Sequence, residues 1–290
     1  MTARRERFSG YAFVAPTAAL LVVVALVPIA AAAWLSFRRV IVVFHEDHFD
    51  GLSNYAFLLE DARFFSALGN TAYFAAVTVG LEIVLGLPMA LLLHRSFRGR
   101  GALRAAVLVP WAIPTVISAR MWAWMWNPDY GIITRLLPAR DVDVLGTPGY
   151  AMHAAILVDV WKSTPFVVLL LLAGVAGIPE EVYLAARVDG ASRWRTFWAI
   201  TIPMLRPTLA VTVLFRGLDA LRVFDVIYAL TGGGPANTTE TLSIYAYRTM
   251  VNVGDFGYGS TLAVATFLTV VVVSAAYLGT IGRSAVRGAR

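Results

Sequence analysis

Long apolar stretches separated by short polar segments dominate the pattern of this sequence. Six of the stretches are long enough to cross a bilayer, because about 20 helical residues span its hydrocarbon core. The pattern therefore predicts an all-α polytopic membrane protein with six transmembrane helices, in which residues 1–290 form a single domain. The predicted spans are residues 11–37, 70–94, 105–126, 153–176, 206–230 and 259–281.

One polar segment, residues 178–207, lies between the fourth and fifth spans and carries signals for helices and a turn, which a simple loop would lack. Pro179, followed by two glutamates, is typical of a helix start. Gly190 predicts a turn with positive φ, after which a helix resumes and meets two prolines where it enters the membrane. The segment is predicted to form a helix–turn–helix along the inner surface. It fits an amphipathic helix resting on lipid headgroups, and it also fits a contact surface for a partner, which Asp189 and Gly190 favour.

Composition and charge support the membrane assignment and orient the chain. Hydrophobic residues make up 59% and charged residues 14%, whereas soluble domains carry about a quarter charged residues. The net charge of +6 does not indicate nucleic-acid binding, because the arginines lie in short loops between apolar stretches. With the N-terminus inside, inner segments hold fourteen arginines and four acidic residues, and outer segments hold six and ten. Both termini are therefore predicted to be cytoplasmic.

Eight ionisable residues lie within the apolar stretches, where each charge costs roughly 2.5–3.5 kcal/mol, so they are expected to face the bundle interior and to pair. They are Glu82, Arg120, Asp159, Lys162, Arg216, Asp219, Arg222 and Asp225. Asp159 and Lys162 are neighbours on one helix face, and the last four recur every three residues along the fifth span.

These charges fit buried ion pairs that fix helix register, and they also fit the polar lining of a translocation path. Aromatic residues beside them, among them Phe166 and Tyr228, would add flat apolar faces to such a path. The predicted path residues are Asp159, Trp161, Lys162, Arg216, Asp219, Arg222, Phe224 and Asp225.

The sequence lacks the motifs of catalysis and cofactor binding. Lys162 is the only lysine, and its surroundings do not match the phosphate-binding loop of ATPases. The glycine-rich "TGGGP" at 231–235 lacks that lysine, and protease motifs are missing. "HEDH" at 45–48 has no evident third ligand, and the absence of cysteine excludes thiolate metal sites. We therefore expect no enzyme activity, cofactor or metal in this chain.

The polar segment resembles the cytoplasmic "EAA" loop of ABC-importer permeases, with a departure at Leu184, where the family pattern has glutamate. The matching residues are Ala185, Ala186, Asp189, Gly190, Ala191, Phe197, Ile200, Ile202, Pro203 and Pro207. The resemblance implies that 178–207 carries a coupling helix between the fourth and fifth spans, which fits a cleft on an ATPase subunit. The residues expected to serve this contact are Glu181, Ala185, Ala186, Arg187, Asp189, Gly190 and Ala191.

The resemblance extends over nearly the whole chain, through segments 51–74, 107–137, 160–179 and 224–235. They are similar to carbohydrate-uptake permeases of the maltose/trehalose type. "LTGGGP" resembles the maltose F-type half of the permease pair, and "WKSTPF" and "FRGLDALRVFD" resemble the trehalose branch.

This resemblance implies one permease subunit of an ATP-driven importer for a di- or oligosaccharide in the bacterial inner membrane. The implied partners are a second permease, two ATPase subunits that bind ATP and Mg²⁺, and an external sugar-binding protein. An ion-coupled secondary transporter stays open as the alternative, with the buried carboxylates as proton or sodium sites. A membrane enzyme is disfavoured by the missing catalytic motifs.

Overall fold

The structure is a computed structural model, and it describes residues 13–136 and 142–288, with side chains as far as residue 280. The predicted inner segment 1–10 lies outside the described residues. The chain divides into two compact units. One consists of the residues up to Phe64 together with Tyr245–Leu268, and the other consists of Phe65–Ile244 together with the residues from Thr269 onward.

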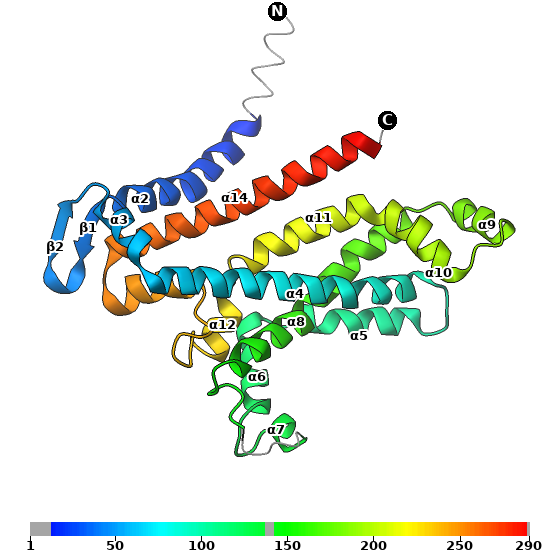
Figure 1. Cartoon of the computed structure of the whole chain (residues 1–290), viewed down its shortest axis with the longest axis horizontal. Helices are drawn as coiled ribbons and strands as arrows, with labels where there is room; N and C mark the ends of the chain where they lie inside the picture. Colours follow the sequence, from blue (N-terminus) through cyan, green and yellow to red (C-terminus); the bar gives the residue numbers. More distant parts are fainter. Residues whose placement is uncertain (1–12, 137–141, 289–290) are drawn as a thin grey trace, which may run out of the picture. The chain divides into compact units, whose positions relative to one another are not determined.

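Helices make up most of the described chain (Figure 1). The α-helices from α2 to α8 are α2 Val27–Leu35, α3 Ser53–Glu60, α4 Ala62–His94, α5 Arg100–Ala112, α6 Thr115–Met125, α7 Ile132–Leu136 and α8 Tyr150–Ala176. Those that follow are α9 Glu180–Val188, α10 Arg193–Thr196, α11 Ile202–Ala220, α12 Asp225–Leu230, α13 Leu242–Tyr247 and α14 Phe256–Gly288. The remaining elements are η1 Val22–Leu26, β1 Arg38–Ile41, η2 Val42–Phe44, β2 Glu46–Phe49, η3 Phe197–Thr201 and η4 Arg248–Val253.

Five helices of the described chain are long and apolar enough to cross a membrane. They overlap five of the six predicted spans, so the prediction of a mostly helical, multi-pass chain is confirmed. They cover Phe13–Leu35, Ala62–His94, Tyr150–Ala176, Arg193–Ala220 and Phe256–Thr280.

The predicted third span, residues 105–126, is wrong as a continuous helix. The structure has two helices there, α5 and α6, which meet at an angle of 92°. Proline disfavours the helical conformation of the residue before it, and Ile113, just before Pro114, is extended with φ −77° and ψ 133°. The two helices pass the length and composition test for one membrane span only when they are taken together.

The predicted fifth span, residues 206–230, also differs from the structure. Its helix begins earlier, at Arg193, and ends at Ala220, and a separate helix α12 begins at Asp225. The Thr241 hydroxyl donates a 3.2 Å hydrogen bond to the carbonyl of Val223, a backbone group released by this break. Arg222 and Asp225 therefore do not continue the helical row that the spacing predicts.

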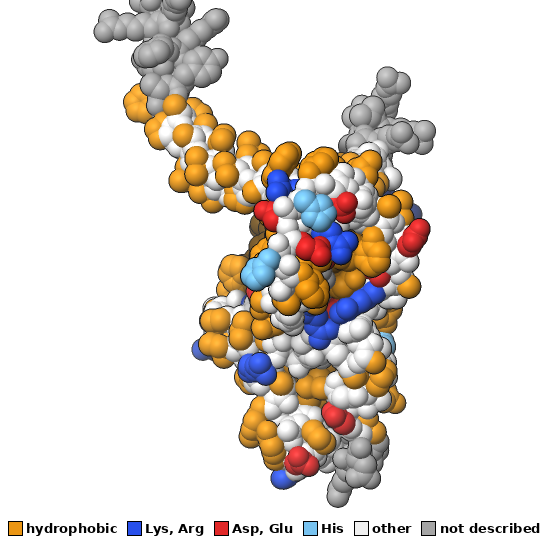
Figure 2. Space-filling model, turned by 90° about the vertical axis from the view of Figure 1, so that its left-hand side faces the viewer, with side chains coloured by type: hydrophobic (Ala, Val, Ile, Leu, Met, Phe, Trp, Pro, Cys, Tyr) orange, Lys and Arg blue, Asp and Glu red, His pale blue; other side chains and the backbone are white. Residues whose placement is uncertain are grey.

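The all-α prediction misses a short antiparallel hairpin in the first unit. Strands β1 and β2 pair Arg38 with Phe49 and Ile41 with Glu46. Ion pairs link the strands, from Arg38 to Asp47 at 2.6 Å and from Arg39 to Glu46 at 2.5 Å. Figure 2 shows charged and histidine side chains gathered over this hairpin, whereas the helix leading to the N-terminus is covered by hydrophobic side chains. The "HEDH" segment thus forms the hairpin turn and part of β2.

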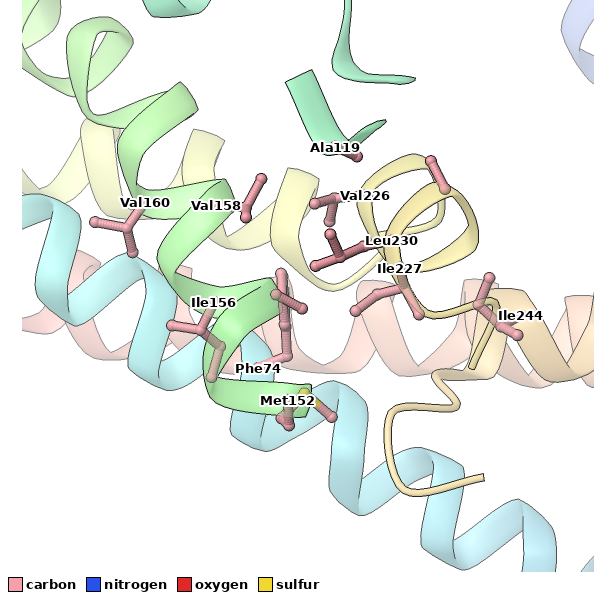
Figure 3. Packing of buried hydrophobic residues seen from close by; sticks show 12 residues of the cluster. Phe74, Ala119, Met152, Ile156, Val158, Val160, Val226, Ile227, Leu230 and Ile244 are labelled. Atoms are coloured by element: carbon pink, nitrogen blue, oxygen red, sulfur yellow. The ribbon is translucent and has the colours of Figure 1, made fainter. Parts of the chain in front are cut away.

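The largest apolar core of the second unit forms where α4, α6, α8 and α12 meet (Figure 3). Phe74 of α4 is fully buried, and it packs with Ile156 and Val158 of α8 and with Ile227 of α12. Ile244 of α13 completes the cluster. This core fixes α8 beside α4 and α12, and α8 also contacts α5 and α11.

Glycines allow the helices of the second unit to approach closely. A Cβ atom on Gly86 of α4 would lie 2.7 Å from a side-chain carbon of Val167 in α8. A Cβ atom on Gly174 of α8 would lie 2.5 Å from the hydroxyl oxygen of Thr208 in α11. Small residues at such contacts are the usual means of packing helices in a membrane. They place α4, α8 and α11 side by side, and these three helices carry the charges described next.

Candidate functional site

A single buried guanidinium joins α4, α8 and α11. Arg216 of α11 donates from Nε to Oε2 of Glu82 at 2.5 Å and from Nη2 to Oε1 at 2.7 Å. Its Nη2 also donates to Oδ2 of Asp159 on α8 at 3.0 Å, and its Nη1 to Oδ2 of Asp219 at 2.5 Å. The side chains of Arg216 and Glu82 are 3% and 0% exposed. The planar fork of arginine matches a carboxylate in this two-point manner, which a lysine ammonium cannot do.

The exposure of the carboxylates changes from the core outward. Asp159 has a side chain 12% exposed, and Asp219 has one 64% exposed. Arg222 lies 3.9 Å from Asp219 and is 67% exposed. Burying charges is costly unless they are paired and hydrogen-bonded, so the inner part of this cluster is a fixed structural unit. The outer part presents charged groups that remain available to a ligand.

A cavity of about 420 Å³ opens beside this cluster. Its charged lining residues are Asp159, Lys162, Arg216, Asp219, Arg222 and Asp225. Flat apolar faces come from Trp111 and Phe166, which stack with ring centroids 6.0 Å apart, and from Phe224. Ligand sites in proteins typically combine apolar walls with a few polar groups, as this cavity does. The cavity therefore offers a ligand both charged hydrogen-bonding groups and flat apolar surfaces.

Seven of the eight predicted path residues line this cavity, and Trp161 does not appear among its lining residues. The Trp161 ring instead packs edge-on against Trp122, with centroids 5.6 Å apart. Within the described residues Lys162 has no ion-pair partner, so the predicted neighbour relation with Asp159 does not produce a salt bridge between them. Asp159 binds Arg216 instead.

The sequence reasoning identified Glu82 as an intramembrane charge but left it out of the predicted path. The available signal is its position as the lone acidic residue of the second span, which requires a partner on another helix. Arg120, which was expected to face the bundle interior and to pair, has an exposed side chain on α6.

The polar segment between α8 and α11 forms two helices around a tight turn. Helix α9 begins at Glu180, directly after Pro179, with Glu180 and Glu181 in its first turn. Gly190 has φ +72°, and the amide of Ala191 donates to the carbonyl of Ala186 at 2.9 Å. The Gly190 amide donates to the carbonyl of Arg187 at 3.1 Å, which completes the glycine-dependent helix stop called a Schellman motif.

The next helix restarts at Arg193. The amide of Arg195 donates to the hydroxyl of Ser192, at 3.2 Å, as a side-chain cap. From there the helix runs without interruption to Ala220, through the π-helical turn η3 and past Pro203 and Pro207. A single helix thus connects the Gly190 turn with Arg216 in the buried charge cluster.

The residues expected to contact an ATPase subunit differ in their exposure to solvent. Ala186 is buried and Ala191 half-buried, whereas Glu181, Ala185, Arg187, Asp189 and Gly190 are exposed. Leu184, which departs from the family pattern, is 47% exposed.

Comparison with known proteins identifies the family. Residues 82–286 match the model of the family described as "Binding-protein-dependent transport system inner membrane component". This chain belongs to that family. The predicted resemblance to ABC-importer permeases and the predicted inner-membrane location are therefore confirmed. The matched region begins at Glu82 and contains the cavity, the Gly190 turn and most of α14.

Sequence similarity to individual proteins covers almost the whole of this permease. The trehalose/maltose transport system permease protein MalF of Thermococcus litoralis is 44% identical over 94% of each chain. The trehalose transport system permease protein SugA of Mycobacterium tuberculosis is 41% identical over 98% of this chain and 92% of its own. Among solved structures, a subunit of a bacterial ABC transporter involved in alginate import has a TM-score of 0.84 at 22% identity, covering 97% and 98% of the two chains.

Proposed function

We propose that this permease is the F-type subunit of an ATP-driven importer for a di- or oligosaccharide of the trehalose or maltose kind. The observation that carries the proposal is the cavity, which combines carboxylates, cations and stacked aromatic rings. It lies at the C-terminal end of the helix that starts after the Gly190 turn. The relatives named as trehalose and maltose permeases support the substrate class.

The proposed importer contains this chain, a second permease, two ATPase subunits and an extracytoplasmic sugar-binding protein. The family description supports the binding protein, and the alginate transporter was also solved together with a sugar-bound periplasmic protein. The ATPase subunits would bind ATP and Mg²⁺, because this chain has no phosphate-binding loop. The chain itself would contribute the path and the coupling contact, with no catalytic residue.

We further propose six spans with both termini in the cytoplasm, counting the bent pair α5–α6 as one span. The excess of arginine in segments on one side supports this orientation. The whole chain, 1–290, would then be one permease domain, with residues 178–207 as its coupling loop. ATP-driven closure of the ATPase pair would move α9 and, through the continuous helix from Arg193, the charge cluster of α11.

In the proposed path, sugar hydroxyl groups bind to the exposed charges, and apolar sugar faces stack on the rings. Asp219, Arg222 and Asp225 offer acceptors and donors, and Lys162 adds an ammonium group with no ion-pair partner within the described chain. Glu82 would act through Arg216, by holding the guanidinium in place.

Sugar uptake by the assembled complex in proteoliposomes tests the proposal. With the binding protein present, labelled trehalose should accumulate when ATP is supplied on the ATPase side, even after a protonophore and a sodium ionophore have collapsed ion gradients. Uptake that stops with the ionophores and continues without ATP would establish the ion-coupled alternative instead. Asp219→Asn should reduce uptake, whereas Asp129→Asn, at an exposed position away from the cavity, should not.

A further inference from the structure

A second cavity, of about 850 Å³, lies on the side of the second unit that carries the Gly190 turn. It is lined by the end of α4 and the residues just after it, by the end of α8, and by α9, α10 and η3. Figure 1 shows α9 and α10 on the side of the second unit where α4 has its C-terminal end. Arg187 and Ala191 of the proposed coupling contact line this cavity, and the proposed function assigns the cavity itself no ligand.

The cavity has an excess of positive charge. Arg95, Arg187 and Arg193 line it, and the structure gives none of these guanidinium groups an ion pair or a side-chain hydrogen bond within the described residues. Glu180 is the single acidic residue among those lining it, and His94 adds an imidazole. Three arginines against one glutamate leave a net charge of +2, so the cavity favours an anion.

The rest of the lining combines apolar residues with the hydroxyl-bearing side chains of Ser96, Tyr183, Thr196 and Thr201. Val175, Ile178 and Phe197 form part of its wall. The cavity also lies at the end of a membrane-length helix, since His94 is the last residue of α4. Basic pockets at such helix ends bind the headgroups of anionic lipids.

Aromatic residues beside the cavity also indicate a position at the lipid surface. Trp194 and Trp198 are 72% and 54% exposed, and their rings lie edge to face with centroids 5.7 Å apart. Phe197, which lines the cavity, lies between them in the sequence and contacts both rings. Tryptophan is enriched at the membrane–water boundary, where its apolar ring and polar N–H are both accommodated.

We propose that this cavity binds the phosphate headgroup of an anionic phospholipid, with the guanidinium groups of Arg95, Arg187 and Arg193 contacting the phosphate and the apolar wall covering the start of the acyl chains. Helix α9 then has two working faces. Glu180, Tyr183 and Arg187 recur at helical spacing along the cavity. Three exposed residues that are expected to contact an ATPase subunit, Glu181, Ala185 and Asp189, lie outside the cavity lining and stay available to a protein partner, as do Leu184 and Val188, which are 47% and 88% exposed. Arg187 lines the cavity, so this proposal assigns it to the lipid and not to the coupling contact.

Lipid binding is measured directly, without sugar or ATP, so this proposal stands or fails independently of the proposed transport function. The full-length chain, with the subunits that co-purify, is titrated with phosphatidylglycerol or phosphatidylethanolamine in mild detergent, and bound lipid is counted by native mass spectrometry. The wild type should retain phosphatidylglycerol preferentially. The double variant R95Q/R193Q should bind it about 25-fold more weakly, given the usual contribution of two basic residues at an anionic surface.

The matched control is R98Q/R195Q, which removes two exposed arginines of the same segments that do not line the cavity. Its affinity for phosphatidylglycerol should equal that of the wild type. Equal weakening in both double variants would show a diffuse surface charge and overturn the proposal. Equal retention of the two lipids by the wild type would overturn it as well.

Two further measurements identify the source of the phosphate and the place of binding. Inorganic phosphate at millimolar concentration should not displace the lipid, and displacement would assign the site to a soluble phosphate compound. Photoactivatable phosphatidylglycerol should crosslink to peptides covering 91–96 or 187–197. Crosslinks confined to other segments, or loss of lipid when an ATPase subunit binds, would assign the cavity to a different occupant.

Discussion

Arg216 serves as the common partner of three carboxylates, and this makes its removal more harmful than the loss of one interaction. In Arg216→Gln, the buried carboxylates of Glu82 and Asp159 lose their cation. Leaving a buried charge without its partner costs about 3–5 kcal/mol, so the yield of folded protein should fall sharply. The double variant R216Q/E82Q removes the most buried carboxylate as well and should recover part of that yield. Fluorescence-detected size exclusion in detergent measures it, and an equally low yield for both variants would contradict this explanation.

Asp61, between α3 and α4 in the first unit, gives a stability that depends on pH. Its Oδ2 accepts hydrogen bonds from the hydroxyls of Tyr245, at 2.7 Å, and Tyr258, at 2.5 Å. Burial alone would raise the pKa of Asp61, but these hydrogen bonds and two backbone amides hold the pKa below its ordinary value. A lowered pKa means that the folded state is stabilised by the ionised form, and that this contribution is lost as the pH falls through the folded-state pKa.

Asp61→Asn should therefore lower the melting temperature at pH 7 and cause a smaller decrease at pH 3–4. Glu60→Gln, at the exposed neighbouring position, is the matched control and should leave the melting temperature unchanged. Differential scanning fluorimetry in detergent follows both. A difference between wild type and Asp61→Asn that is constant over this pH range would show that the ionised form is not the stabilising one.

At the scale of elements, close packing of α4 against α8 depends on Gly86. The Cβ of an introduced valine would lie 2.7 Å from a side-chain carbon of Val167, whereas a Cβ at Gly80, on the same helix, meets nothing within 4 Å. Overpacking costs typically about 1–3 kcal/mol, so Gly86→Val should lower the melting temperature clearly more than Gly80→Val. Both variants introduce the same residue into the same helix, so their difference isolates the contact. Equal melting temperatures would mean that α4 and α8 separate easily.

Element boundaries show what the sequence could and could not predict. The apolar pattern located the five membrane-length helices of the described residues, and Pro179 and Gly190 marked the bounds of α9. Pro114 was a visible signal for the break between α5 and α6, but the uniform hydrophobicity around it hid the break. The end of α11 at Ala220 has no local signal, because residues 221–224 contain neither glycine nor proline. There the carbonyl of Val223 accepts a hydrogen bond from Thr241, which lies 18 positions further along the chain.

The candidate site was predictable only in part for the same reason. Ionisable residues inside hydrophobic spans are expected to pair, and this expectation identified Asp159, Arg216 and Asp219 as candidate site residues. The identity of the partners depends on which helices are adjacent, and Glu82 is 134 positions from Arg216 in the chain. Periodicity along one helix cannot supply that information. The hairpin escaped prediction as well, because its strands are only four residues long.

At the scale of the whole molecule, the proposed coupling would use the Gly190 turn and the charge cluster as the two ends of one mechanical connection. The helix from Arg193 to Ala220 is continuous, so a displacement of the turn would be transmitted to Arg216 as long as the turn keeps its shape. The proposed coupling therefore depends on the positive φ of Gly190, +72°, more than on any contact that a side chain at this position would make. A Cβ added at Gly190 would meet nothing within 4 Å.

Gly190→Val tests this connection, because a β-branched residue is strained at that φ by about 1–3 kcal/mol while the free space around it allows the chain to fold. Asparagine tolerates the left-handed conformation, so Gly190→Asn is the matched control. In the reconstituted importer we expect Gly190→Val to hydrolyse ATP with little sugar transport, and Gly190→Asn to keep most of the sugar transported per ATP. If the two variants show the same ratio, the backbone conformation of the turn does not carry the coupling. The contact would then depend on the side chains of α9, beginning with the exposed Leu184 and Val188.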